Sequence, residues 1–281
     1  MALGGGTARA TAHVGALKVL EQAGLSPDMI AGTSSGGILA ALYAMGSHAT
    51  ALEHIVRSQN TTEVWAQAVD FGLHRAGLIH GKRLMNWLDR KFFYGATFAD
   101  TEIPLVITCT DVETGELVFL REGSLAKAVV ASCALPGIFA PFEWDGRWLI
   151  DGGFVSTVPF QALENNGLAT IIGLHAGVRV EQSSFIKAVR RMHNSSLGQW
   201  YEKMLQTFPL PTAWHLLNKG MVRVIASYSQ TLTAPEESYL VNLAPPIAWW
   251  DFHRSPEAIQ AGEAAMAEAL ASLPLSVRIG G

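Results

Sequence analysis

The hydrophobic pattern of the first fifty residues alternates between short apolar runs and longer helical stretches. Residues 11–24 carry apolar side chains at helical spacing, and Gly24 stands where that helix would end. Residues 27–32 predict a short buried strand, and 34–46 predict a second helix. With residues 1–3 as a first short strand, this order predicts the beginning of a parallel sheet.

The rest of the chain adds further strands and a terminal helix. Ser255 is expected to cap that helix, with Pro256 at its first position. In chain order, the pattern predicts two strands around a Thr-Gly turn in 102–120, a hairpin around Asp145-Gly146 in 142–153, strands in 169–177 and 238–245, and a helix over 255–273.

Length and composition favour one α/β domain. The chain has 281 residues, of which 49% are hydrophobic and 16% charged, which suits a sheet covered on both faces. No repeat, low-complexity tract or linker divides it, so we expect a single domain over 1–281. Residues 181–229 have a mostly helical pattern interrupted by prolines.

Charge and cysteine usage narrow the possible partners and compartments. The net charge is −4 and no tract is rich in Lys or Arg, so no nucleic-acid partner is expected. Cys109 and Cys133 lie in apolar surroundings, which favours buried thiols in a reducing compartment. No signal peptide or membrane-spanning run is recognisable, and we therefore expect a cytoplasmic protein.

The stretch "IAGTSSGG" contains the first candidate for chemistry. A G-x-S-x-G pattern places its serine on a sharp strand-to-helix turn, where larger neighbours would clash. Centred on Ser34 the flanks are Gly32 and Gly36, whereas centred on Ser35 one flank would be Thr33. Ser34 is therefore the candidate nucleophile, although the pattern alone also describes an ordinary loop.

Two further motifs surround this serine in the sequence. "GGGTAR", residues 4–9, exposes successive backbone N–H groups that can hold an anion, but it does not complete a G-x-G-x-x-G dinucleotide motif. "LIDGG", residues 149–153, places Asp151 before two glycines. Taken alone, this aspartate is either a turn former or a carboxylate held in a tight site.

Taken in order, these three motifs resemble the patatin-like phospholipase family. The similarity extends over "LGGGTARATAHVGALKVLEQAG", "IAGTSSGGILAALYA", "ASCALPGIFAPFEWDGRWLIDGGFVSTVPFQAL" and "DFHRSPEAIQAGEAAMAEAL", and so covers most of the chain. The resemblance implies a three-layer α/β/α patatin-like fold with a mainly parallel central sheet, whose core motifs fall in 4–160. Residues 181–229 are apolar, broken by prolines and outside these motifs, and we therefore expect them to border an acyl pocket or a membrane-facing rim.

The resemblance also implies a serine lipid acyl hydrolase. Ser34 would attack an ester carbonyl and Asp151 would act as general base, giving an acyl-enzyme that water hydrolyses. No metal or organic cofactor is implied. The family pattern assigns the oxyanion hole to the N–H groups of Gly5, Gly6 and Thr7, and assigns motif glycines to Gly32, Gly36 and Gly152.

The substrate is left open among phospholipid, lysophospholipid, neutral glyceride and soluble ester. Eight tryptophans, including Trp200, Trp214 and the Trp249-Trp250 pair, are compatible with peripheral membrane contact. Packing in the core is the more common role of such aromatic residues.

One departure from the family pattern and two alternatives remain. Thr7 stands where a third glycine is usual, and a β-branched residue is disfavoured at positive φ, so one alternative is a binding protein that has lost catalysis. The other is an α/β-hydrolase with a Ser-His-Asp triad, whose histidine would be His175, His193, His215 or His253. Its elbow usually follows several strands, whereas Ser34 follows one, which argues against it.

Overall fold

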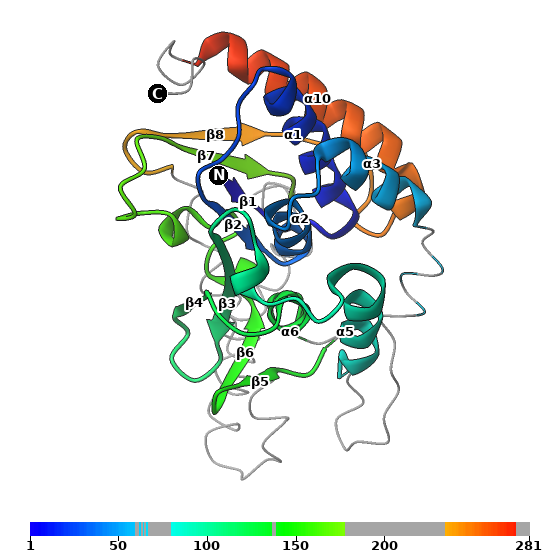
Figure 1. The fold of residues 1–281 in the computed structure, drawn as a ribbon, viewed down its shortest axis with the longest axis vertical. Coiled ribbons are helices and arrows are strands. Elements are labelled where there is room, and N and C mark those ends of the chain that lie inside the picture. Colours follow the sequence, from blue (N-terminus) through cyan, green and yellow to red (C-terminus); the bar gives the residue numbers. More distant parts are fainter. Residues whose placement is uncertain are drawn as a thin grey trace, which may run out of the picture.

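The protein is a mixed α/β molecule built around one sheet (Figure 1). The computed structural model describes residues 1–59, 80–136, 139–177 and 234–273, together with the isolated positions 62, 64 and 66. The strands are β1 (Ala2–Leu3), β2 (Ile30–Thr33), β3 (Leu105–Asp111), β4 (Leu117–Leu120), β5 (Phe142–Trp144), β6 (Arg147–Asp151), β7 (Ile171–His175) and β8 (Ser238–Asn242).

The sheet is parallel in its larger part. Its strand order is β5-β6-β3-β2-β1-β7-β8, with β4 also paired to β3. Strands β3, β2, β1, β7 and β8 run parallel, whereas β4, β5 and β6 form antiparallel pairs. The predicted α/β class and mainly parallel sheet are confirmed.

The longer helices share one hydrophobic core with one face of the sheet. On β3, Leu105 and Ile107 join this core, while Val106 points into a smaller cluster with Phe160 and Leu163 on the other side. The helices are α1 (Ala12–Gln22), α2 (Ser35–Ala44), α3 (Ala49–Ser58), α5 (Lys82–Leu88), α6 (Leu125–Ser132) and α10 (Ser255–Ser272). Short helical turns are η1 (Thr7–Thr11), η2 (Asp89–Phe93), η3 (Phe98–Asp100), η4 (Gly152–Phe154), η5 (Phe160–Ala162) and η7 (Phe252–Arg254).

The C-terminal helix α10 lies along α1 at very short range (Figure 1). A Cβ atom at Gly262 would lie 1.9 Å from the Ala12 carbonyl oxygen, and one at Gly15 would lie 1.9 Å from the Ile259 oxygen. Neither position tolerates a side chain while the backbones stay in place. These two glycines therefore fix how closely the last helix packs on the first.

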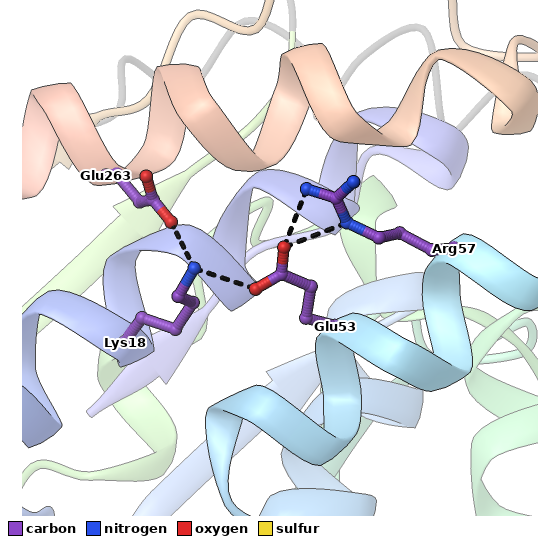
Figure 2. Close-up of polar contacts among 4 residues, drawn as sticks. All are labelled: Lys18, Glu53, Arg57 and Glu263. Carbon is purple, nitrogen blue, oxygen red and sulfur yellow. Dashed lines mark hydrogen bonds and ion pairs between the residues drawn. The ribbon is translucent and has the colours of Figure 1, made fainter.

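Charged side chains connect the same two helices to α3 (Figure 2). The Lys18 ammonium lies 2.7 Å from a carboxylate oxygen of Glu53 and 2.6 Å from one of Glu263. Arg57 contacts the other Glu53 oxygen at 2.7 Å. The four side chains are partly exposed, so the network orients the helices and adds little to the free energy of unfolding.

Most of the elements predicted from the sequence are confirmed, with one correction. Ser255 is the first residue of α10 and makes no capping hydrogen bond; the cap position is Arg254, whose side chain also makes none. The pattern did not predict α3, α5 or α6. The expectation for 181–229 lies outside the described residues. No described helix has the length and apolar character needed to cross a membrane.

The α1–α10 crossing gives a prediction with a defined sign. On helix propensity alone, Gly262→Ala should raise the free energy of unfolding by about 1 kcal/mol. Because the added Cβ would meet backbone, we expect instead a loss of about 1–3 kcal/mol or more, measured by urea unfolding. Ala264→Gly, at an exposed position of the same helix, is the control and should cost only about 1 kcal/mol. A stabilised Gly262→Ala protein would contradict the close crossing.

Candidate active site

The three sequence motifs meet at one edge of the sheet. The loops after β1, β2, β7 and β8 leave at the same edge because these strands are parallel. In the neighbouring pairs, Thr33 is level with Thr108, and Cys109 is level with Asp151. Strand β4 pairs with residues 107–110 on one edge of β3, so β2 and β6 follow one another along its other edge. Ser34 and Asp151 are therefore neighbours on the same edge of β3, although 117 positions separate them in the sequence.

Ser34 occupies the turn between β2 and α2 in a strained backbone conformation. Its φ is 54° and its ψ −132°, and the residue is 8% exposed. The flanking glycines allow this turn: a Cβ at Gly32 would lie 2.5 Å from the Gly37 Cα, and one at Gly36 would lie 2.3 Å from the Gly4 oxygen. The structure thus gives both motif glycines a steric reason.

Ser132, at the end of α6, holds this turn from behind and was not predicted from the sequence. Its hydroxyl accepts a hydrogen bond from the Ser34 N–H at 2.7 Å and donates one to the Thr108 carbonyl at 2.7 Å. The hydroxyl thereby satisfies a buried donor on β2–α2 and a buried acceptor on β3. The available signal was a serine at the end of a helix whose other residues, apart from Lys127, are apolar.

Asp151 ends β6 as a buried carboxylate, 3% exposed. It accepts a hydrogen bond from the Gly153 N–H at 2.8 Å. Burial raises the pKa of Asp151 to about 6, and the adjacent Ser34 hydroxyl and the Gly153 N–H oppose that rise by stabilising the ionised form. Gly152 lets the strand end approach β3, because a Cβ there would lie 2.4 Å from the Thr108 oxygen.

Cys133 is a second side chain at the serine that the motifs did not reveal. The Ser34 hydroxyl is near enough to the Cys133 sulfur to lower the pKa of its thiol slightly. Burial and the nearby Asp151 carboxylate raise the pKa of Cys133, so the thiol stays protonated at neutral pH. Burial likewise raises the pKa of Cys109, which agrees with the buried, unreactive thiols expected from the sequence.

The glycine loop, residues 4–7, lies directly beside Ser34. A Cβ at Gly5 would lie 3.1 Å from the Ser34 Cβ. Three N–H groups of the loop are already engaged: Gly4 with the Leu174 oxygen at 3.0 Å, Gly5 with the Thr157 oxygen at 3.2 Å, and Gly6 with the Ser35 Oγ at 3.2 Å.

Thr7 supplies the N–H group of this loop that has no hydrogen-bond partner within the described residues. Its φ of 52° places a β-branched residue in the left-handed region, which is the unfavourable conformation that the departure from the glycine pattern predicts. The strained backbone is nevertheless the one adopted, and within the described residues it leaves the Thr7 N–H unbonded in the loop beside Ser34.

The described histidines do not take the place that a Ser-His-Asp triad would give them beside Asp151. His13 is fully buried and its Nε2 lies 2.7 Å from the Gly4 oxygen, so it supports the glycine loop; burial lowers its pKa to about 4. His175 ends β7, and His253 is exposed in η7. No histidine of the described residues interacts with Asp151. His193 and His215 lie outside those residues.

A serine at a strand-to-helix elbow beside a buried aspartate, on a mainly parallel sheet, defines a class of α/β protein with an elbow serine at the sheet edge. The family model for patatin-like phospholipase matches residues 1–164, a segment that contains both side chains. The chain belongs to the patatin-like phospholipase family.

Individual relatives are similar at moderate identity. The chain is 30% identical over 255 residues to patatin-like phospholipase domain-containing protein 6 of Homo sapiens, covering 88% of this chain and 18% of that protein. It is 27% identical over 273 residues to a patatin-like phospholipase domain-containing protein of Caenorhabditis elegans, covering 93% and 20%. An uncharacterized NTE family protein of Mycobacterium tuberculosis is 28% identical over 226 residues, covering 78% and 60%.

The chain therefore spans about a fifth of the human and nematode relatives and 60% of the mycobacterial one. Among solved structures, VipD from Legionella pneumophila matches 95% of this chain and 66% of its own, with a TM-score of 0.48 and 15% identity.

Ser132 gives a prediction about a residue behind the nucleophile. Ser132→Ala removes the hydroxyl shared by the Ser34 N–H and the Thr108 oxygen, so the free energy of unfolding should fall by about 1–3 kcal/mol. Ester hydrolysis should fall at least about tenfold, because the elbow loses its support. Ser272→Ala, which removes an exposed hydroxyl bonded to the Ala269 oxygen, is the control for both measurements. Unchanged stability and activity in Ser132→Ala would remove the bridging role.

Proposed function

We propose that this protein is a serine acyl hydrolase that cleaves carboxylic ester bonds of lipids with Ser34 as nucleophile and Asp151 as general base. The observation that carries the proposal is that the strand registers bring Ser34, at its elbow, beside the buried Asp151 carboxylate, whose pKa is raised to about 6 by burial. A base is most effective when its pKa lies near the working pH, and this carboxylate is still mostly ionised at pH 7.

In the first half of the reaction, the Ser34 Oγ attacks the ester carbonyl carbon as its proton passes to Asp151. The tetrahedral intermediate collapses, the carbon–oxygen bond to the alcohol breaks, and Asp151 returns the proton to that alcohol. An acyl group then remains on Ser34. In the second half, Asp151 takes a proton from water, the hydroxide attacks the acyl carbonyl, and the proton returns to the Ser34 Oγ as the acid leaves.

The glycine loop is the proposed source of oxyanion stabilisation. The Thr7 N–H is the donor without a partner in the described chain, and the Gly6 N–H bonds only to the hydroxyl of Ser35, which can rotate away. We assign the oxyanion hole to these two N–H groups. The Gly5 N–H, bonded to the Thr157 carbonyl, holds the loop and was grouped with the donors by the sequence motif alone. Each donor is worth about 3 kcal/mol of barrier.

Lipid esters are the proposed substrate class because the chain belongs to the patatin-like phospholipase family and its relatives carry phospholipase and NTE names. The site contacts support a Ser–Asp pair more than a triad, because no described histidine bonds to Asp151. They also argue against a purely binding role. A buried ionised carboxylate destabilises the fold, and such a cost is retained where a function requires the charge.

Serine identity is tested by covalent labelling and hydrolysis together. A serine-directed phosphonate should label the wild-type protein at Ser34, and Ser34→Ala should lose both the label and hydrolysis of p-nitrophenyl esters by several orders of magnitude. Ser35→Ala should keep the label and lose activity by no more than about tenfold, because it removes only the Gly6 tether. Labelling at Ser35, or an active Ser34→Ala protein, would refute the assignment.

The second prediction concerns Asp151 and pH. Asp151→Asn should lower kcat by at least about 10³, and wild-type kcat/KM should fall below pH about 6, as the carboxylate becomes protonated. The folded pKa lies above the unfolded value, so ionised Asp151 costs stability, a cost that appears as pH rises from about 4 to 6 and persists above. Asp151→Asn should therefore be more stable than wild type at pH 7.5 by up to about 3 kcal/mol.

Urea unfolding of both proteins at pH 4 and pH 7.5 measures this difference, which should shrink at pH 4. Histidine variants complete the test: folded His175→Gln and His253→Gln proteins, and the corresponding His193 and His215 variants, should keep substantial activity. If one of them is as inactive as Ser34→Ala, a triad replaces the proposed pair.

A further inference from the structure

Two adjacent tryptophans are exposed on the loop between β8 and α10. Trp249 and Trp250 are 41% and 48% exposed, and their rings pack edge to face with centroids 5.2 Å apart. The loop beneath them is firmly anchored, because Leu243 and Ile247 are 2% and 3% exposed in the core. The two rings are therefore partly exposed on an anchored loop, and we call residues 243–251 the tryptophan loop.

This loop is bonded to the backbone that follows the glycine loop. The Ala8 N–H donates to the Trp249 carbonyl at 2.9 Å, and the Arg9 Nε donates to the Ile247 carbonyl at 2.7 Å. Ala8 directly follows Thr7, which carries the donor proposed for the oxyanion. The tryptophan pair is thus bonded to the residue that follows the proposed oxyanion donor in the sequence.

The sheet places both features on the same edge. Strand β8 runs parallel to β7, and β7 to β1, so the tryptophan loop leaves the sheet where the glycine loop and Ser34 leave it. A surface that received the two rings would therefore also face the edge that carries the candidate active site.

The chemistry of the loop favours a phospholipid surface that carries no net charge. Tryptophan rings are amphipathic and concentrate at the boundary between hydrocarbon and headgroups. Among the described residues, the two arginines next to the loop already have partners: Arg9 bonds to the Ile247 carbonyl, and Arg254 pairs with Glu257. The net charge of −4 gives little electrostatic attraction to anionic lipid. Insertion of the aromatic rings is therefore the mode of membrane binding that the loop favours.

We propose that the tryptophan loop is the element by which this protein docks on a phospholipid bilayer, presenting the Ser34 edge of the sheet to the lipid. The proposal rests on the function proposed above for its substrate, and it adds the surface through which that substrate is reached. Docking would hold the rings at the headgroup boundary while the hydrogen bonds from the Ala8 N–H and the Arg9 side chain keep the glycine loop beside them.

The first measurement is cosedimentation with phosphatidylcholine vesicles, made in the Ser34→Ala background so that no lipid is consumed. Trp249→Ala/Trp250→Ala should bind at least tenfold more weakly than its parent, and Trp250→Ala alone should bind at an intermediate level. Trp148→Ala, which removes an indole that is 36% exposed on β6, is the matched control and should bind as the parent does. Binding should persist in about 1 M NaCl, where screening removes surface charge effects.

The second measurement compares two substrates in the otherwise wild-type protein. Both substitutions keep the Trp249 backbone carbonyl that accepts from the Ala8 N–H. The double variant should therefore hydrolyse a short soluble p-nitrophenyl ester within about twofold of wild type, which also shows that it folds, and should lose at least tenfold on phosphatidylcholine vesicles. A wild-type protein that hydrolyses neither substrate but binds vesicles through the tryptophans would refute the proposed function alone.

Three outcomes would overturn the docking proposal itself. These are vesicle binding by the double variant equal to that of its parent, release of the parent by salt, or absence of vesicle binding by the parent. The last outcome would leave a protein partner as the occupant of the tryptophan loop.

Discussion

The contact on which the site depends is the approach of the α2 backbone to the ends of β1 and β2 with no side chain between them. A Cβ at Gly36 would lie 2.3 Å from the Gly4 oxygen, so any larger residue would force the helix and the glycine loop apart. The same approach leaves one residue to reverse the chain between strand and helix. That residue is Ser34, whose left-handed backbone places it beside both the loop and Asp151.

The electrostatics of the site depend on a carboxylate that is buried without a cation. Within the described chain, the groups that act on Asp151 are the Gly153 N–H and the Ser34 hydroxyl, and burial outweighs both. A nearby arginine would hold the pKa low and make the carboxylate a weak base. Hydrogen bonds alone leave the pKa at about 6, close to neutrality. The fold carries the cost of this charge, and the rest of its core must supply the compensating stability.

How much of this was predictable from the sequence varies with the range of the interaction. Ser34 and its flanking glycines follow from local steric rules, because a G-x-S-x-G turn admits one register. Asp151 was identifiable only by family resemblance, since its height beside Ser34 is set by pairing through β3. The direction of its pKa shift required knowledge of burial. Ser132 and Cys133 escaped prediction because their partners are brought to them by tertiary packing of α6.

Thr7 illustrates how long-range support decides a local question that sequence rules leave open. By local preference, a β-branched residue at a φ of 52° is unfavourable by about 1–3 kcal/mol. Such strain persists only where the surroundings over-determine the backbone, and here both sides of the residue are fixed. The bonds that fix them run from Gly4 N–H to Leu174, from Gly5 N–H to Thr157, from Gly6 N–H to Ser35, from His13 to the Gly4 oxygen, and from Ala8 N–H to Trp249.

Because β7, the 157 segment, α2, α1 and the tryptophan loop each contribute one of these bonds, the conformation of Thr7 is determined by the whole edge of the sheet. Glycine is then unnecessary at this position. The Thr7 side chain makes none of these bonds, and the bonds leave its backbone a single conformation. The threonine changes what the turn depends on. Glycine at position 7 would adopt the left-handed backbone without strain, whereas threonine adopts it only when the surrounding elements are in place.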